Sequence, residues 1–153
     1  MSKKRYETRV AVFLLLVKND LNNNKKILLQ KRENTGYMDG MYDTCASGHL
    51  EFNESIKEAM IREAKEETCI EINSKDLNLV LTYHASQRDN EVPYLRFYFT
   101  TNNYVGEPKI GEKEKCSEMI WADLDKLPQN IIPHLKIAID NYIKGNNYCQ
   151  DEF

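Results

Sequence analysis

Apolar residues change their spacing several times along the chain, and each change predicts a different element. Runs that are apolar throughout, or that alternate with polar residues, predict β-strands at residues 9–18, 26–32, 41–46, 77–85, 94–101 and 118–122. Two other stretches, residues 55–68 and 133–144, are typical of helices with apolar positions on one face. This order predicts the α/β (α+β) class, with a mixed β-sheet in one domain over residues 1–153.

Several local signals mark where these elements begin and end. Before the first helix, Asn53 can serve as the N-cap, and Ser55 with Glu58 also fits a capping box. The second helix has Pro133 at its start and a glycine at its end. Residues 146–153 are polar, and we expect them to form a loose tail.

Composition and charge narrow the class of partner. The chain has 153 residues and a net charge of −3, from 21 Lys and Arg against 24 Asp and Glu. Without excess positive charge, a nucleic-acid polymer or an anionic membrane is not the expected partner. The apolar run at residues 10–17 is far shorter than the roughly 20 residues of a spanning helix. With no signal peptide pattern and no CxxC spacing among its four cysteines, the chain is predicted to be cytoplasmic with reduced thiols.

Glutamates occupy the apolar face of the first predicted helix. With Ile56 at zero and about 100° per residue, Glu63 falls at about 340° and Glu67 at about 20°. Glu66 falls at the edge of that face, at about 280°. An ionised carboxylate facing the interior costs several kcal/mol unless it is compensated. Either the helix rotates or ends early, leaving Glu66 and Glu67 in water, or divalent cations neutralise the cluster. Oxygen ligands of this kind suit Mg²⁺ or Mn²⁺.

The residues around this helix follow a known spacing. Gly48 is followed after five residues by Glu54, and after seven more by Arg62-Glu63-Ala64-Lys65-Glu66-Glu67-Thr68-Cys69-Ile70. This segment resembles the Nudix box, G-x5-E-x7-R-E-U-x-E-E-x-G-U, where U is aliphatic. Cys69 departs from it by replacing the last glycine. The resemblance implies a Nudix-type α/β/α sandwich, with a mixed sheet between helices, and the chemistry of a Nudix hydrolase.

The resemblance also implies roles for the box glutamates. Glu66 and Glu67 would be the main ligands of Mg²⁺ or Mn²⁺, and Glu63 another ligand or the base that activates water. Glu54 would be an auxiliary ligand, and the main-chain carbonyl of Ser47 a further one. Bound metal and an activated water together suit the hydrolysis of a pyrophosphate.

Two other positions complete the predicted catalytic set. Arg62 matches the box arginine, which is usually structural, and its spacing from Glu66 allows it to orient that carboxylate. Family enzymes often use a further glutamate from a downstream loop. Here the candidates are Glu112 and Glu114, with Glu112 preferred, although both could belong to a solvated run of charges.

The segment before the box leaves room for a different enzyme class. Asp43, Gly48 and His49 match the Asp-x4-Gly-His form of the isopentenyl-diphosphate isomerase branch. That branch has its catalytic cysteine directly before Gly-His, where this chain has Ser47, while Cys45 lies two residues earlier. An isomerase-like enzyme is therefore the less favoured alternative. A non-catalytic nucleotide-sensing module is another, and the complete acidic set argues against it.

The expected substrate is a nucleoside diphosphate linked to another group. A nucleoside triphosphate cleaved to monophosphate and pyrophosphate is preferred, with ADP-ribose or another nucleotide sugar as the alternative, and the enzyme would act as a monomer or homodimer. Several aromatic or long apolar residues could stack on a base or belong to the core: Tyr37, Met38, Tyr42, Tyr83, Tyr94, Phe97 and Tyr98. The candidates for phosphate contacts are Arg9, Arg32, Arg88, Arg96 and His49.

Overall fold

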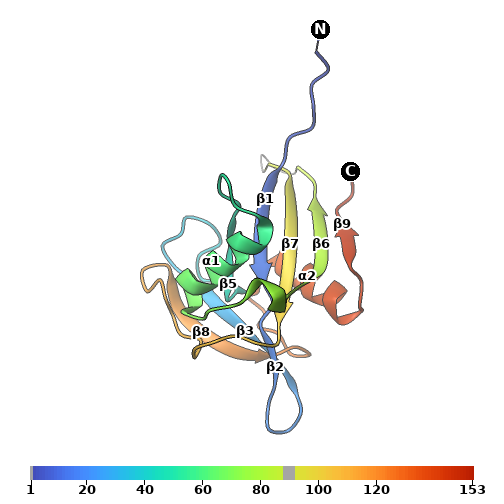
Figure 1. Cartoon of the computed structure of the whole chain (residues 1–153). Coiled ribbons are helices and arrows are strands. Elements are labelled where there is room, and N and C mark those ends of the chain that lie inside the picture. Colours follow the sequence, from blue (N-terminus) through green and yellow to red (C-terminus); the bar gives the residue numbers. More distant parts are fainter. Residues whose placement is uncertain (1, 88–91) are drawn as a thin grey trace.

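Two β-sheets and two helices make up the computed structural model, which describes residues 2–87 and 92–153 (Figure 1). The first sheet has the strand order β5 (Ala46–His49), β1 (Arg9–Leu14), β7 (Tyr94–Thr101), β6 (Leu77–Ala85) and β9 (Tyr148–Gln150). It is mixed, because β1 runs parallel to β7 and β6 runs parallel to β9, while the β1–β5 and β6–β7 pairs are antiparallel.

The second sheet is built around β3 (Lys25–Arg32). This strand pairs antiparallel with β2 (Val17–Asn19), β4 (Tyr42–Thr44) and β8 (Cys116–Asp123). The predicted class, α/β with mixed pairing and two helices, is confirmed. The expected mixed sheet is the first sheet, and the remaining strands form a second one beside it.

The division into two sheets arises inside runs that the sequence presents as single strands. The strand predicted at residues 9–18 is two strands, because β1 ends at Leu14 and β2 begins at Val17. Leu15 and Leu16 connect the sheets, and both are fully buried. The strand predicted at 41–46 is likewise divided into β4 and β5, which belong to different sheets. An unbroken apolar run cannot reveal such a crossing, because every part of it is buried.

Each helix covers a different core. The helix α1 (Ile56–Thr68) packs against β1 and β5 through Ala59, Met60 and Ala64, all fully buried. The helix α2 (Pro133–Ile143) packs against β6 and β9 through Leu135, Ala138 and Ile139. A short 3₁₀ helix, η1 (Ser74–Asp76), leads into β6. No helix in the described part of the chain is long and apolar enough to cross a membrane.

Ser55, rather than Asn53, is the N-cap of α1. The Ser55 hydroxyl accepts a hydrogen bond from the Glu58 N–H (3.1 Å), and the Ser55 N–H donates to the Glu58 carboxylate (2.7 Å). This reciprocal pair is the predicted capping box. The cap fixes where the helix starts, and therefore which glutamates share its inner face.

The segment after residue 145 is ordered by strand pairing, so the predicted loose tail is wrong. The strand β9 continues the first sheet beside β6, with Thr82 opposite Tyr148 and His84 opposite Gln150. Beyond β9, the Asp151 carboxylate accepts hydrogen bonds from the Tyr83 hydroxyl (2.6 Å) and the Ser86 N–H (3.0 Å). The polar composition of this segment suggested solvent exposure, but its backbone and Asp151 find partners on β6.

Cys69, which replaces the box glycine, ends α1 in the left-handed conformation, with φ 63°. A side chain in this region costs about 1 kcal/mol relative to glycine. We therefore expect Cys69→Gly to keep the fold and raise the free energy of unfolding by about 0.5–1 kcal/mol. Urea denaturation measures this, with Cys149→Ala as a control for loss of a thiol elsewhere. A less stable or non-cooperatively unfolding Cys69→Gly variant would show that the cysteine side chain stabilises this helix end.

Candidate active site

The glutamates of α1 lie as the helical periodicity predicts. The Glu63 side chain is only 13% exposed, whereas that of Glu66 is 50% exposed. Glu67 faces inward and lies among residues of two other strands. The helix therefore keeps two of its carboxylates in the protein, and the alternative in which Glu67 lies in water is wrong.

Two strands bind the Glu67 carboxylate. The Gln30 side-chain amide on β3 donates to Oε1 (3.0 Å), and the Ser47 N–H on β5 donates to Oε2 (2.6 Å). Burial raises the pKa of Glu67 to about 8, although both hydrogen bonds oppose that rise. The raised pKa means that the neighbouring groups do not supply enough positive charge to stabilise the ionised carboxylate.

Arg62 binds the neighbouring acids. Its guanidinium donates to both oxygens of Glu54 (3.0 and 2.8 Å) and to Oε1 of Glu63 (2.7 Å). The predicted partner Glu66 is a longer contact, at 3.4 Å. Arg62 therefore orients chiefly Glu54 and Glu63. The spacing of Glu54, eight residues before Arg62 and outside the helix, did not indicate this pairing.

Gly48 allows the Glu63 carboxyl group to lie against β5. A Cβ atom at position 48 would overlap that carboxyl group, so only glycine permits the approach. Burial raises the pKa of Glu63, while the Arg62 guanidinium opposes the rise. The Glu63 carboxyl group therefore packs directly against the backbone of Gly48.

The loop before β8 brings Glu112 to this group. The Lys109 N–H donates to the Thr68 carbonyl (3.0 Å) and the Gly111 N–H donates to the Glu67 carbonyl (2.9 Å), which fastens the loop to the end of α1. The next residue, Glu112, lines the cavity described below and pairs with Lys115 (3.3 Å). Glu114 is exposed and does not line that cavity.

These side chains surround a cavity of about 870 Å³. Its acidic lining includes Glu63, Glu67 and Glu112, and its basic lining is Arg9, Arg32, Arg96 and Lys115. The aromatic side chains that line it are Phe13, Tyr37 and Tyr94. Of the other predicted stacking residues, Tyr42, Tyr83 and Tyr98 are buried in the α2 core, Met38 packs against that core, and Phe97 packs against the α1 core. Arg88 lies outside the described residues.

Comparison with known proteins identifies the family. Residues 7–142 match the family model of the NUDIX domain. The chain belongs to the Nudix family. Its expected chemistry is accordingly that of a Nudix hydrolase, which acts on pyrophosphate bonds.

Individual relatives agree with this assignment. A protein of Methanocaldococcus jannaschii named ADP-ribose pyrophosphatase is 31% identical over 148 residues, which cover 95% of this chain and 83% of that protein. A MutT NUDIX hydrolase from Burkholderia pseudomallei has a similar structure, with a TM-score of 0.76 and 23% identity over 88% of this chain and 98% of its own. A NUDIX hydrolase from Nitrosomonas europaea has a TM-score of 0.73 and 26% identity over 93% of both chains.

Outside the Nudix box, the structure adds polar residues that sequence reasoning missed. Gln30 binds Glu67, as described above. Asp43 is buried in the cavity wall and pairs with Arg32 (3.0 Å), and burial raises its pKa while Arg32 opposes the rise. His134, at the start of α2, also lines the cavity. Gln30 and Asp43 are polar residues inside predicted strands. This polarity was the feature of the sequence that could have indicated a place in the active site.

Cys45 does not lie where a catalytic cysteine of an isomerase-like enzyme would be needed, whereas His49 does reach the cavity. Cys45 is completely buried between β4 and β5, does not line the Nudix cavity, and has a pKa raised well above that of a free thiol by burial. The His49 ring lines the cavity and shares a hydrogen bond with the Tyr94 hydroxyl (2.8 Å). A reactive thiolate at position 45 has no support in this geometry.

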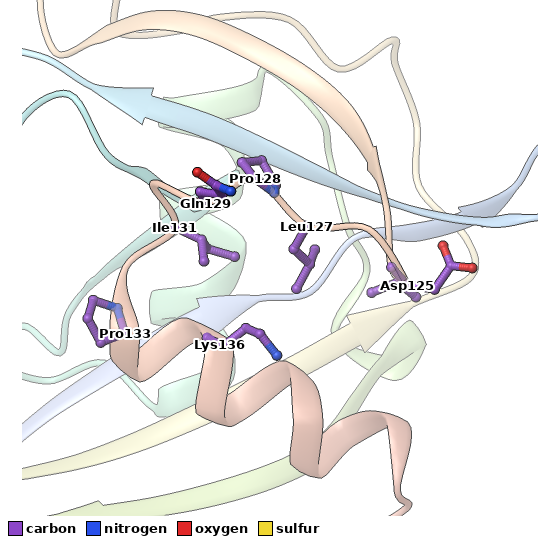
Figure 2. A pocket seen from close by; sticks show the side chains of 8 residues that line it. Asp125, Leu127, Pro128, Gln129, Ile131, Pro133 and Lys136 are labelled. Atoms are coloured by element: carbon purple, nitrogen blue, oxygen red, sulfur yellow. The ribbon is translucent and has the colours of Figure 1, made fainter.

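A second cavity, of about 420 Å³, lies between the segment after β8 and the start of α2 (Figure 2). Its lining is largely apolar and includes Leu127, Pro128 and Ile131. The charged lining residues are Asp125 and Lys136, and Lys136 pairs with Asp140 (2.8 Å). It contains none of the box glutamates, so the larger cavity is the candidate active site of this Nudix domain.

The donor atoms in the larger cavity fit a hard divalent cation. Among residues 2–87 and 92–153, no three His, Cys, Asp or Glu side chains converge as a ready-made metal site. Arg62 and Gln30 instead bind Glu63 and Glu67. The chemistry of the site nevertheless suits Mg²⁺ or Mn²⁺, because its donors are carboxylate oxygens and burial leaves their charge poorly compensated.

The raised pKa of Glu67 predicts that the metal-free Nudix protein loses stability as pH rises. Between the ordinary value of 4.5 and about 8, the folded state keeps a proton that the unfolded state has lost. The contribution of Glu67 to the free energy of unfolding is therefore largest below pH 4.5 and falls as pH rises through 8, by at most about 1.4 kcal/mol per pH unit. Urea denaturation in EDTA at pH 5–8 should show this fall, and Glu67→Gln should flatten it. Parallel curves for the two proteins would contradict the prediction.

Proposed function

We propose that this protein is a Mg²⁺- or Mn²⁺-dependent hydrolase of a nucleoside diphosphate linked to another group, with a nucleoside triphosphate as the expected substrate and a monophosphate and pyrophosphate as products. The observation that carries the proposal is the pair of inward-facing carboxylates, Glu63 and Glu67, on the wall of a cavity that also holds four basic side chains. Acids placed to hold cations, beside bases placed to hold phosphates, suit hydrolysis of a charged anhydride.

The proposed cation ligands are the glutamates of α1 and their neighbours. Glu63, Glu66 and Glu67 would hold the metal, with the Ser47 carbonyl and Glu54 in supporting positions. A bound divalent cation neutralises phosphate oxygens and lowers the pKa of water. Glu63 and Glu112 are the candidates to accept the proton of the attacking water, since both line the cavity.

The protein's own side chains would bind and orient the substrate. Arg32 is held by Asp43 and by the Tyr37 carbonyl (2.8 Å), so its guanidinium is already positioned in the cavity wall. Arg9 and Lys115 add positive charge to the same wall. Tyr37, which is 39% exposed on the cavity wall, is the candidate to stack on a base, whereas the Phe13 ring already stacks on Tyr98 (centroids 4.7 Å apart).

ADP-ribose is a second candidate substrate. It is favoured by one observation, namely the 31% identity to the protein named ADP-ribose pyrophosphatase over 95% of this chain. The two candidates share the diphosphate and differ in what is attached to it. They therefore differ in products, since ADP-ribose would yield AMP and ribose 5-phosphate.

A product-resolved screen tests the proposal. Purified protein is incubated with nucleoside triphosphates, ADP-ribose, other nucleotide sugars or isopentenyl diphosphate, with Mg²⁺ or Mn²⁺, and the products are separated by anion-exchange chromatography. We expect hydrolysis of a nucleoside diphosphate derivative, abolished by EDTA and restored by added metal. Full activity in EDTA, isomerisation of isopentenyl diphosphate, or tight nucleotide binding without turnover would each contradict it.

A further inference from the structure

Arg96 on β7 is a buried cation whose guanidinium has no polar partner. The residue is 8% exposed, yet it lines the large cavity. Across residues 2–87 and 92–153, no hydrogen bond or ion pair reaches this guanidinium. Its neighbours are instead two aromatic rings, with centroids 5.2 Å away for Tyr83 and 5.4 Å away for Tyr94. None of its nitrogens is among the buried, unpartnered side-chain atoms of the described residues, so the guanidinium is open to the cavity and available to a ligand there.

One of these rings is anchored from outside the cavity. The Tyr83 hydroxyl donates a short hydrogen bond to Oδ1 of Asp151 (2.6 Å), and the Ser86 N–H donates to Oδ2 (3.0 Å). The Asp151 N–H donates to the His84 carbonyl (3.0 Å), which extends the pairing of β9 with β6. Both oxygens and the backbone of Asp151 are therefore bound, and Tyr83 has a single defined partner.

The charges of Asp151 and Arg96 both favour their contacts with Tyr83, which lies between them. A phenol that donates to a carboxylate has a more electron-rich ring, and such a ring attracts a cation at its face more strongly. The Asp43 carboxylate, in the same cavity wall, also acts electrostatically on Arg96. Burial and Asp151 both raise the pKa of Tyr83, while Arg96 opposes the rise, so Tyr83 interacts with both charged groups.

We propose that Asp151 is a positioning residue for substrate binding, because it fixes Tyr83 and thereby holds the unpaired Arg96 guanidinium toward the cavity. The ligand of Arg96 is an oxygen-rich, negatively charged group of the substrate. The inference rests on the proposed function, since that function supplies such a substrate. In the first sheet, β9 lies at the opposite edge from β5 (Figure 1).

Kinetics of two conservative variants test this role. Asp151→Asn removes the charge, and Tyr83→Phe removes only the hydroxyl. With whichever nucleotide the wild type hydrolyses, we expect each variant to raise KM about five- to tenfold with kcat within about twofold. In an Arg96→Gln background, Asp151→Asn should have little further effect. Glu152→Gln, an exposed change in the same segment, should leave KM unchanged.

A spectroscopic readout separates this inference from the proposed function. The Nε–Hε signal of Arg96 in ¹⁵N-labelled protein reports how well its guanidinium is ordered, without any substrate. We expect Asp151→Asn and Tyr83→Phe to shift and narrow this signal as the side chain becomes mobile, while Glu152→Gln leaves it unchanged. An unchanged Arg96 signal in both variants overturns the positioning role even if the enzyme is active. If no substrate is hydrolysed, the proposed function fails while this measurement still tests the positioning of Arg96.

Discussion

Glu67→Gln is expected to lower kcat by a factor on the order of 10²–10³ or more, with the fold unchanged. The substitution keeps the size of the side chain and an oxygen that can accept the hydrogen bond from Ser47. It removes the negative charge proposed to hold a divalent cation. Because burial raises the pKa of Glu67 to about 8, the carboxyl group of the metal-free protein is mostly protonated near neutral pH, and a neutral amide in its place should not make unfolding easier.

The measurement is kcat at saturating metal and substrate, together with circular dichroism and thermal unfolding. Glu66→Gln, at the other main proposed ligand, should also lower kcat strongly. Glu71→Gln is the matched control, because Glu71 is exposed and pairs only with Lys65 (3.1 Å) among the described ion pairs. Near-normal turnover in both the Glu66 and Glu67 variants at saturating Mg²⁺ would rule out the catalytic assignment.

Arg62→Ala is expected to weaken both stability and metal binding. The side chains of Glu54 and Glu63 are 14% and 13% exposed, and Arg62 is their described ion-pair partner. Without it, two poorly solvated carboxylates face one another's charge, which should lower the free energy of unfolding by about 2–4 kcal/mol at neutral pH. The lost orientation of Glu63 should weaken apparent metal affinity by about 10- to 100-fold.

Metal titration of the activity separates the two effects. We expect the Mg²⁺ concentration for half-maximal rate to rise, with partial recovery of kcat at high Mg²⁺. Arg62→Lys keeps the charge but cannot bind both oxygens of Glu54 and Glu63 together, so it should give an intermediate result. If Arg62→Ala leaves the Mg²⁺ dependence unchanged and alters only the unfolding temperature, then Arg62 stabilises the fold without orienting the ligands.

The features that were predicted depend on residues close together in the sequence, whereas the features that were missed depend on contacts between distant segments. The inward direction of Glu63 and Glu67 follows from helical geometry, and the capping box at Ser55 follows from four consecutive residues. By contrast, the division of residues 9–18 between two sheets was not predictable, because residues 10–17 are apolar throughout. The pairing of residues 148–150 with β6 was also missed, since polar residues on an edge strand carry little periodic signal.

The sequence by itself determined the family, the helix that carries the acids, and the acids that share one face, because these depend on spacing within a single segment. Only the tertiary structure decided what meets those acids and what completes the cavity. Gln30 reaches Glu67 from 37 positions away, and Asp151 reaches Tyr83 from 68 positions away. Such contacts depend on strand register and on the packing of two cores, and these are properties of the whole folded chain rather than of any segment.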